Sequence, residues 1–412
     1  MTNGYPLKKF AYESMGLGSN GYVDQMRGKM TFIPYGRQDI RPEDIAAVTR
    51  VLQSDFLTTG PEIEKFERAI ASYVGAEYCV VVANGTAALH LAVLALELDK
   101  GSMGITSPNT FVATSNALVY AGLTPDFVDI DPNHYVIDPD RLKSRLEESK
   151  PSVVLPVHFA GNTYGIERIS ELCRKDGIKV IEDASHSMGG SYSDGSLVGS
   201  CSYSDMTTFS FHPVKTMTCG EGGAVTTNNP ELYSRLLTLR THGITRDTEN
   251  LSVNPGPWYY EMQELGFNYR MTDFQAALGR SQLSRLNEYV NRRAQIVNRY
   301  NEAFSGIPWL KTPQFDIARS NSWHLYIILI DWDKIGVDRP QFMAKLLEAG
   351  IGSQVLYIPV PDQPYYRHTY SSDVFEIPNA REYYEHSLAI PLYPAMSDID
   401  QERVVDAVVQ FK

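Results

Sequence analysis

The sequence predicts an α/β protein with a large, mainly parallel sheet domain followed by a smaller α+β unit. From about residue 78 to residue 227, short apolar runs alternate with amphipathic runs of helical length, which is typical of a parallel sheet covered on both faces. Beyond residue 276, one long amphipathic run precedes a few mixed elements. We therefore expect a flexible arm over residues 1–30, a large domain over 31–275, and a linking helix with a small domain over 276–412.

Composition limits the classes of function. A chain of 412 residues can bury a full core in two or three domains. Its net charge of −12 argues against broad binding of nucleic acid or of an anionic membrane, although helix N-termini and local arginines can still bind a small anion. The sequence has no secretory leader pattern and no membrane-length apolar run, and its cysteines indicate a reducing compartment, so we expect a cytoplasmic protein. These cysteines, which show no C-x-x-C spacing, are Cys79, Cys173, Cys201 and Cys219.

The elements of the large part follow from periodicity and from turn residues. Arg41 precedes an amphipathic helix that runs to about Leu52, with acidic residues in its first turn, and a second helix is expected over Glu62–Tyr73. Strands are expected over Tyr78–Ala83, Gly104–Ser107, Asp126–Ile130, Val153–Val157, Lys179–Glu182, Met206–Phe211 and Ala224–Thr227. Helices between them are expected over Thr86–Leu96, Ala113–Tyr120, Pro139–Glu148 and Ile166–Lys175.

The C-terminal part begins at a capping-box pattern. Thr272 and Gln275 have the spacing of such a box and predict one long helix to about Phe304, which either bridges two domains or lies within one large domain. The remaining expected elements are strands over Trp323–Asp331 and Ile351–Ile358, a helix over Arg339–Ala349, and the segments His386–Leu392 and Asp398–Phe411.

The N-terminal arm contains a formal G-x-G-x-x-G pattern. Gly16, Gly18 and Gly21 match it, but no strand precedes them and no amphipathic helix follows. A dinucleotide-binding turn requires both of these elements. We therefore interpret the arm as flexible.

Lys215 lies on a loop after a strand, in Ser210-Phe-His-Pro-Val-Lys215. Taken alone, such a lysine is usually a solvated surface residue. Asp183, however, ends another apolar strand, and Gly85-Thr86 forms a turn between a strand and a helix. A phosphate-binding turn, an acid at a strand end and a loop lysine together indicate a site for pyridoxal phosphate (PLP). Lys215 would bind the cofactor covalently and transfer protons, since desolvation near a positive ring lowers a lysine pKa.

Asp183 is the candidate partner of the pyridine nitrogen of PLP. An ionised carboxylate there keeps that nitrogen protonated. The alternative is a helix N-cap before Ala184. Glu182, the preceding residue, should point to the opposite face of the strand.

The phosphate and the flat ring of PLP require further partners. The turn Gly85-Thr86-Ala87 offers backbone N–H groups and a hydroxyl at a helix N-terminus, and Ser210 offers a second hydroxyl. Phe111 follows a strand and could stack on the ring, although core packing explains an aromatic residue there equally well.

His186 admits three interpretations. Together with Asp183 and Ser185 it suggests a hydrolase triad or a metal ligand, but the sequence has no G-x-S-x-G elbow and its other histidines lack metal-ligand spacing. We therefore expect no metal. His186 is expected near the phenolic oxygen of PLP.

Several segments jointly resemble the DegT/DnrJ/StrS family of PLP-dependent nucleotide-sugar aminotransferases. They are Asn84-Gly-Thr-Ala-Ala-Leu, Glu182-Asp-Ala-Ser-His, Ser210-Phe-His-Pro-Val-Lys, Gly220-Glu-Gly-Gly and Gly266-Phe-Asn-Tyr-Arg-Met-Thr-Asp. The resemblance runs from about residue 31 to the C-terminus and implies PLP-dependent transferase fold type I, as in aspartate aminotransferase. It assigns the covalent lysine to Lys215 and the pyridinium partner to Asp183. It further implies phosphate contacts by Thr86, Ala87 and Ser210, with Phe111 stacked and His186 at the phenolic oxygen.

The resemblance also implies a homodimer with shared active sites. Asn268 of one subunit would reach the cofactor phosphate of the other. The family substrates are a nucleotide-linked keto-sugar and an amino-acid donor, here expected to be L-glutamate.

Three segments are most similar to the branch of the family that acts on UDP-linked 4-keto-6-deoxy-N-acetylhexosamines in pseudaminic acid synthesis. They are Ile33-Pro-Tyr-Gly-Arg-Gln, Pro257-Trp-Tyr-Tyr-Glu-Met-Gln-Glu-Leu-Gly and Gln363-Pro-Tyr-Tyr-Arg. The similarity makes Tyr35, Gln38 and Tyr357 the expected substrate contacts.

Two features depart from the family. Its members commonly read H-Y-x-P-x-H where this chain has Leu356-Tyr-Ile-Pro-Val-Pro361, so apolar residues replace two polar groups near the sugar. The N-terminal arm is also longer than expected. The departures leave open another keto-sugar as substrate. A dehydratase is disfavoured because that branch of the family replaces the lysine with histidine, and a non-catalytic sugar-binding protein is disfavoured by the presence of both Lys215 and Asp183.

Overall fold

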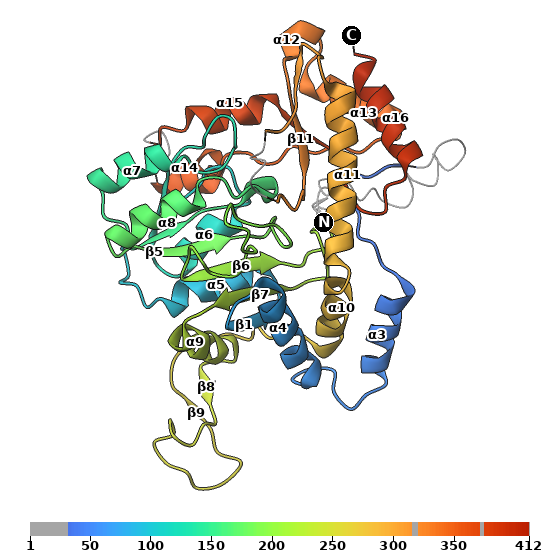
Figure 1. The fold of residues 1–412 in the computed structure, drawn as a ribbon. Coiled ribbons are helices and arrows are strands. Elements are labelled where there is room, and N and C mark those ends of the chain that lie inside the picture. The colour runs from blue at the N-terminus through green and yellow to red at the C-terminus, as the bar shows by residue number, and fades with distance from the viewer. Residues whose placement is uncertain (1–31, 315–319, 371–374, 412) are drawn as a thin grey trace, which may run out of the picture.

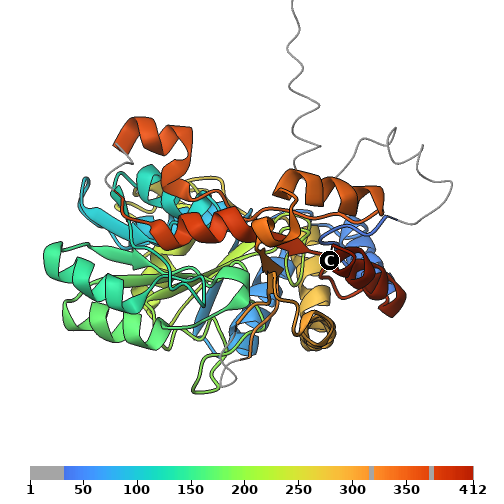
Figure 2. The ribbon, with the colours of Figure 1, turned by 90° about the horizontal axis from the view of Figure 1, so that it is seen from above.

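The computed structural model describes residues 32–314, 320–370 and 375–411. The expected arm over residues 1–30, with its glycine pattern, lies outside these residues. Figure 1 shows a large sheet layer with helices around it, and a smaller unit at the top of the view. Figure 2, seen from above, turns the orange and red elements of this smaller unit toward the viewer. Within the described ranges, no helix is both long and apolar enough to cross a membrane.

A seven-stranded sheet forms the large part, in the order β1-β7-β6-β5-β4-β2-β3. The pairs from β6 through β5, β4 and β2 to β3 are parallel, and β7 runs antiparallel to both of its neighbours. The prediction of a mainly parallel sheet is therefore confirmed. The strands are β1 (Tyr78–Val82), β2 (Met103–Thr106), β3 (Thr124–Phe127), β4 (Val153–Leu155), β5 (Lys179–Asp183), β6 (Met206–Ser210) and β7 (Gly223–Thr227).

Helices cover both faces of this sheet because successive strand side chains point to opposite sides. On β1, Val80 and Val82 pack with α5, α6 and α9, whereas Cys79 and Val81 pack with α4 and α10. The helix α5 is almost wholly buried, which explains why it is apolar on all sides. The helices of this part are α3 (Pro42–Leu52), α4 (Pro61–Val74), α5 (Gly85–Ala95), α6 (Ala113–Tyr120), α7 (Pro139–Glu148), η1 (Phe159–Gly161), α8 (Ile166–Lys175) and α9 (Pro230–Arg240).

The long helix expected from Thr272 to Phe304 is two helices, α10 (Asp273–Leu283) and α11 (Leu286–Phe304). The expected capping box of Thr272 and Gln275 is present. The break has a physical reason: Arg285 leaves helical geometry (φ −114°, ψ 8°) and donates to both carboxylate oxygens of the buried Asp44, at 2.6 and 2.7 Å. This ion pair ties the break to the start of α3.

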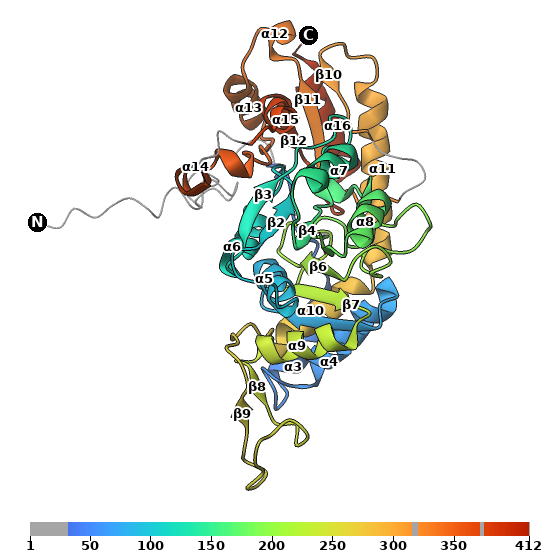
Figure 3. The same cartoon turned by 90° about the vertical axis from the view of Figure 1, so that its left-hand side faces the viewer.

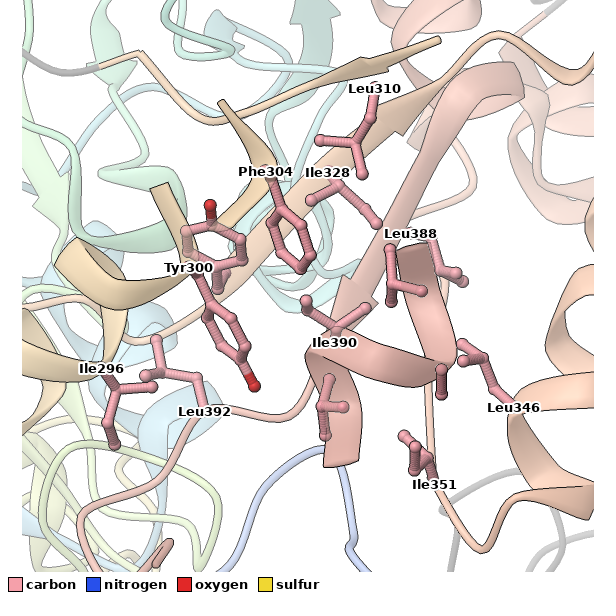
Figure 4. Packing of buried hydrophobic residues seen from close by; sticks show 14 of the residues in the cluster. Ile296, Tyr300, Phe304, Leu310, Ile328, Leu346, Ile351, Leu388, Ile390 and Leu392 are labelled. Carbon is pink, nitrogen blue, oxygen red and sulfur yellow. The ribbon is translucent and has the colours of Figure 1, made fainter. Parts of the chain in front are cut away.

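The small unit is a three-stranded antiparallel sheet, β10-β11-β12, packed against α11, α13 and α16. Its core brings Tyr300 and Phe304 of α11 against Ile328 and Ile390 of the sheet (Figure 4). The elements are β10 (Leu310–Lys311), β11 (Tyr326–Ile330), α12 (Trp332–Ile335), α13 (Arg339–Glu348), η2 (Val360–Asp362), α14 (Pro364–Tyr370), α15 (Pro378–His386), β12 (Ser387–Ile390) and α16 (Asp398–Val409). The domain boundary near residue 275 stays a prediction.

Some sequence predictions of elements were wrong. The segment expected as a strand over Ile351–Ile358 forms only two isolated bridges, Ile33 with Ile351 and Gln354 with Ala389, because it crosses from the small sheet toward the large part. The strand expected at Asp126–Ile130 begins two residues earlier, at Thr124. The sequence interpretation also missed α9, α12, α14, α15, β10 and a hairpin of β8 (Ile244–Thr245) with β9 (Glu261–Met262). This hairpin projects from the body of the molecule (Figures 1 and 3).

Strand β5 ends in two adjacent buried acids, and the first has a purely structural environment. The carboxylate of Glu182 accepts hydrogen bonds from His158 Nε2 (2.5 Å), Ser204 Oγ (2.5 Å), Tyr192 Oη (2.7 Å) and Thr207 Oγ1 (3.1 Å). Burial by itself raises the pKa of Glu182, but these donors more than offset it, so the pKa lies below its ordinary value.

We expect Glu182→Gln to lower the free energy of unfolding by about 2–3 kcal/mol, because an amide NH₂ would face donors in a buried site. Since the pKa of Glu182 is lowered in the folded state, this stabilisation is present above the ordinary glutamate pKa and is lost as the pH falls through the lowered value. Urea unfolding of the wild type and the variant measures the difference. Glu171→Gln is the matched control, since Glu171 is an exposed partner of Arg168 on α8. A loss as small as that of the control would contradict this account.

Candidate active site

The carboxyl ends of the parallel strands meet at one edge of the large sheet. The loops that leave β1, β5 and β6 there carry three segments singled out from the sequence: Asn84–Ala87, Asp183–His186 and Ser210–Lys215. In α/β sheets this edge is where ligands bind. The topology therefore brings the predicted site residues of these segments to one edge.

The N-terminus of α5 is packed tightly against the end of β6. A Cβ built on Gly85 would lie 2.8 Å from Ser210 Cβ and 3.1 Å from Ser210 Oγ, so only glycine allows this approach. Asn84 caps the helix by accepting a hydrogen bond from the N–H of Ala87 at 2.9 Å. The hydroxyl group of Ser210 thus lies beside the first turn of a helix, where unpaired N–H groups and the helix dipole favour an anion.

Asp183 is buried at the end of β5 and is held in place from two sides. Its Oδ2 accepts a hydrogen bond from Thr114 Oγ1 at 2.6 Å, and its Oδ1 accepts one from the N–H of Ser185 at 3.1 Å. The segment after Asp183 is a turn, so Asp183 does not cap a helix. As expected, Glu182 contacts a different set of groups, on the other side of the strand.

Lys215 lies in an environment that favours its neutral amine. Burial lowers the pKa of Lys215 to about 8, and the negative charge of Asp183 partly opposes this shift. Lys215 thus lies within electrostatic range of Asp183. A lysine that releases its proton near pH 8 can serve as a nucleophile and a base.

His186 is neutral, and its tautomer follows from its contacts. Burial, and then the charge of Lys215, hold the pKa of His186 well below its usual value. Its Nδ1 accepts a hydrogen bond from the N–H of Ala160 at 3.3 Å, so the proton resides on Nε2, which lies 3.5 Å from Tyr357 Oη. His186 therefore presents an N–H donor toward the side of the site where Tyr357 lies.

The expected substrate contacts lie around the same residues. Burial raises the pKa of the Tyr357 hydroxyl well above its ordinary value, and the nearby Tyr35 and Asp183 raise this pKa further. Phe111 is 57% exposed, and its ring centroid lies 5.9 Å from that of Tyr357. The exposed Gln38 lines a small hollow together with Lys215.

Asn268 is exposed and lies in the segment that pairs with Thr241 after α9. Among the described residues, no hydrogen bond joins the side chain of Asn268 to Lys215, Thr86 or Ser210 of its own chain. The structure therefore leaves this side chain available at the surface.

The metal-site and hydrolase interpretations of His186 find no support. Over the described ranges, no three His, Cys, Asp or Glu side chains gather as a group that could hold a metal ion. Ser185 donates its backbone N–H to Asp183, and among the described residues the imidazole ring of His186 contacts Ala160 and Tyr357 and no serine hydroxyl.

The sequence profile of the DegT/DnrJ/EryC1/StrS aminotransferase family matches residues 38–409. The chain belongs to this family. It is 40% identical over 92% of its length, and over 96% of the relative, to the spore coat polysaccharide biosynthesis protein SpsC of Bacillus subtilis. It is 36% identical over 91% of its length to the UDP-4-amino-4,6-dideoxy-N-acetyl-β-L-altrosamine transaminase of Campylobacter jejuni, of which it covers 96%. Its fold matches Helicobacter pylori PseC, an aminotransferase of pseudaminic acid biosynthesis, with a TM-score of 0.84 at 27% identity, covering 92% of this chain and 99% of PseC.

The resemblance inferred from the motifs is thus confirmed, together with fold type I. The DegT/DnrJ/EryC1/StrS enzymes are PLP-dependent nucleotide-sugar aminotransferases, and this chain is one of them. The residues present fit PLP. The Gly85–Ser210 contact forms an anion cradle, Asp183 is a buried carboxylate, and Lys215 has a lowered pKa.

Sequence reasoning missed three residues that shape this site. Thr114 holds Asp183, His324 packs on His186 with ring centroids 4.3 Å apart, and Arg293 donates to the carbonyl oxygens of Trp323 (3.1 Å), His324 (3.2 Å) and Leu392 (3.0 Å). Arg293 is fully buried without a carboxylate partner among the described residues, and burial lowers its pKa to about 9. Thr114 carried a signal, since it is a hydroxyl residue in the helix that follows Phe111; the other two depend on long-range packing.

The lowered pKa of Lys215 predicts a pH dependence for cofactor loading. Only the neutral amine attacks an aldehyde, so the rate at which the apoenzyme takes up PLP should rise with pH through a midpoint near 8, not near the ordinary lysine value of 10.5. Stopped-flow absorbance gives this profile. Because Asp183 opposes the shift, Asp183→Asn should move the midpoint to lower pH. A midpoint that stays above 10 in the wild type, or that rises in the variant, would contradict this environment.

Proposed function

We propose that this aminotransferase moves an amino group from L-glutamate to the C4 ketone of a UDP-linked 4-keto-6-deoxy-N-acetylhexosamine. The product would be a UDP-4-amino-4,6-dideoxy sugar for pseudaminic-acid-type or related surface glycans. The observation that carries the proposal is the end-to-end similarity to the Campylobacter jejuni transaminase, whose name describes such a product, combined with the fold match to PseC. The segments around Tyr35, Tyr259 and Tyr365 support the same branch of the family.

Each residue at the sheet edge has a proposed task. Lys215 holds the cofactor between turnovers, removes the proton from Cα of the amino donor and returns a proton to C4 of the sugar. Asp183, fixed by Thr114, keeps the pyridine nitrogen protonated. Bound PLP supplies an acceptor for the electron pair left on carbon when Cα loses its proton.

The remaining contacts are proposed to orient the cofactor and the substrate. Thr86, Ala87 and Ser210 hold the phosphate at the N-terminus of α5. Phe111 covers the ring, and His186 donates its Nε2 proton toward the phenolic oxygen. Tyr35, Gln38 and Tyr357 contact the sugar nucleotide, a proposal supported by their position beside Lys215 and Asp183.

The proton-transfer role is tested by Lys215→Ala. We expect loss of the absorbance band of the covalently bound cofactor and a fall in amino transfer of at least about 10⁴-fold, the scale on which a residue that is both acid and base contributes. The assay follows formation of the UDP-amino sugar by mass spectrometry with glutamate as donor. Lys143→Ala on the exposed side of α7 is the matched control and should retain full activity. Activity in the Lys215 variant comparable to that of the control would refute the scheme.

A different keto-sugar is the second candidate for the acceptor. Two observations favour it: the 40% identity to a spore coat polysaccharide protein, and the apolar residues Leu356 and Pro361 at positions that are histidines in many relatives. Leu356 packs against Tyr383, and its carbonyl oxygen accepts a hydrogen bond from the Tyr383 hydroxyl at 3.1 Å. Pro361 is buried. A panel of 4-keto and 3-keto nucleotide sugars, compared by kcat/KM, separates the two candidates.

We further propose a homodimer in which Asn268 of each subunit completes the partner's active site. The exposed position of Asn268 supports this, since its side chain has no hydrogen bond to the cofactor residues of its own chain among those described.

Subunit mixing tests the shared site. Lys215→Ala and Asn268→Ala should each be poorly active, while co-refolded mixtures should recover about a quarter of wild-type activity, because half of the dimers are mixed and each has one intact site. Replacing the second variant by the Lys215→Ala/Asn268→Ala double variant removes every intact site and is the control. A mixture no more active than this control would rule out the shared arrangement.

A further inference from the structure

A second cavity lies where the small sheet meets a loop of the large part, and its lining residue Tyr383 separates it from the segment that carries Tyr357. Its volume is about 380 Å³, within the range of about 300–1,000 Å³ that is usual for small-molecule sites. It is open to solvent on one side and lined by the loop after β3, the edge strand β10, the end of β11 with α12, and α15. None of its lining residues belongs to the set assigned to PLP or to the UDP-sugar.

The cavity combines flat apolar walls with hydrogen-bonding groups. The rings of Tyr135 and Tyr383 lie 4.8 Å apart, and Trp309 of the small-unit core also lines the cavity. The side chains with polar groups come from all of the enclosing segments. They are Asn133, Lys311, Asp331, Lys334, Asn379, Glu382 and His386.

The charges around the cavity balance one another. Lys334 pairs with Asp331 at 2.8 Å, and Lys311 and Glu382 contribute one charge of each sign. His386 Nδ1 donates to the carbonyl oxygen of Ile330 at 2.8 Å, which leaves its Nε2 as a further hydrogen-bonding atom. Positive and negative side chains balance around the cavity, so the lining does not select a phosphate or a polycation. It favours an uncharged ligand with many hydrogen-bonding groups.

Tyr135 gives the cavity an unused polar group. The residue is 8% exposed, and its hydroxyl group is buried without a hydrogen-bond partner among the described residues. Its backbone has a positive φ of 61°, a strained conformation that Asn109 supports by donating to the Tyr135 carbonyl oxygen at 3.0 Å. Burial, and then the charges of Asp131 and Glu382, raise the pKa of Tyr135 to about 12, so its hydroxyl stays protonated. Leaving such a group without a partner is costly. Its oxygen is covered by neighbouring atoms, so a ligand hydroxyl that displaces this cover would supply the missing partner.

We propose that this cavity binds a neutral saccharide, of the size of one or two hexose units. A pyranose ring presents apolar C–H faces that suit aromatic and proline walls, and a rim of hydroxyl groups that suits amide, carboxylate and phenol partners. Pro132 and Pro308 extend the flat walls beside Tyr135 and Tyr383. Asn133, Asn379 and Glu382 supply the acceptors and donors around them. This inference does not depend on the identity of the amino acceptor.

Ligand-observed saturation-transfer NMR tests the site, with N-acetylglucosamine as the probe and PLP-loaded protein. Saturating UDP-N-acetylglucosamine is added so that both the nucleotide part and the sugar part of the active site are occupied. With the wild-type protein, we expect saturation transfer to the N-acetylglucosamine signals, and we expect this transfer to persist when the UDP-sugar is present. Tyr135→Phe removes only the unpartnered hydroxyl, and Glu382→Gln removes one acceptor charge. Each should raise the apparent Kd for N-acetylglucosamine about five-fold or more.

The matched control is Glu385→Gln, because Glu385 lies on α15 beside Glu382 and does not line the cavity. It should bind the probe like the wild type. Loss of transfer on addition of the UDP-sugar would place the probe in the active site and overturn the proposal. Equal weakening in all three variants, unchanged binding in both cavity variants, or stronger binding of glucuronic acid than of N-acetylglucosamine would also overturn it.

Discussion

The structure depends on burying two adjacent carboxylates at the end of one central strand. A strand sends consecutive side chains to opposite faces, so Glu182 and Asp183 cannot share partners. Four donors satisfy Glu182 on one side, drawn from the loop after β4, the turn after β5 and the start of β6. Among the described residues, the Asp183 carboxylate accepts hydrogen bonds from one hydroxyl and one backbone N–H. Glu182 thus links the segments around β5 and β6 through hydrogen bonds. Asp183 retains acceptor capacity for a cationic partner.

Two close backbone approaches shape the side of the site where the phosphate is proposed to bind. Strand β7 runs against its neighbours and begins at Gly223, where a Cβ would lie 2.4 Å from the carbonyl oxygen of Asn84. Gly85 in turn accommodates Ser210. These two close approaches explain why glycines appear both in the turn before α5 and in the Gly220-Glu-Gly-Gly segment after the lysine loop. Side chains at either position would push the helix N-terminus away from the end of β6.

The sequence was informative where local pattern decides the outcome. Alternating apolar runs predicted the parallel sheet, and the sequence correctly placed Asp183 and Ser210 at the ends of strands, with Lys215 on the loop after the second. It was uninformative where distant contacts decide. The Arg285–Asp44 ion pair splits a helix whose periodicity runs through the break, and Arg293 Nη1 donates to carbonyl groups that no motif marks. Nothing local reveals that Ile351–Ile358 leaves its sheet, since its composition is that of a strand.

That last segment has a consequence for how such enzymes diverge. In the described structure, residues 351–358 pair with a sheet only through the isolated bridge of Gln354 to Ala389 in β12, while Tyr357 lies beside His186 and Leu356 contacts Tyr383. A segment without a ladder of strand pairing can exchange side chains, or shift its path, without altering the register of either sheet. Under the proposed contact of Tyr357 with the sugar nucleotide, relatives can change that contact in this strip while retaining the lysine, the acid and the phosphate turn. Grafting the strip between relatives offers protein engineers the same freedom.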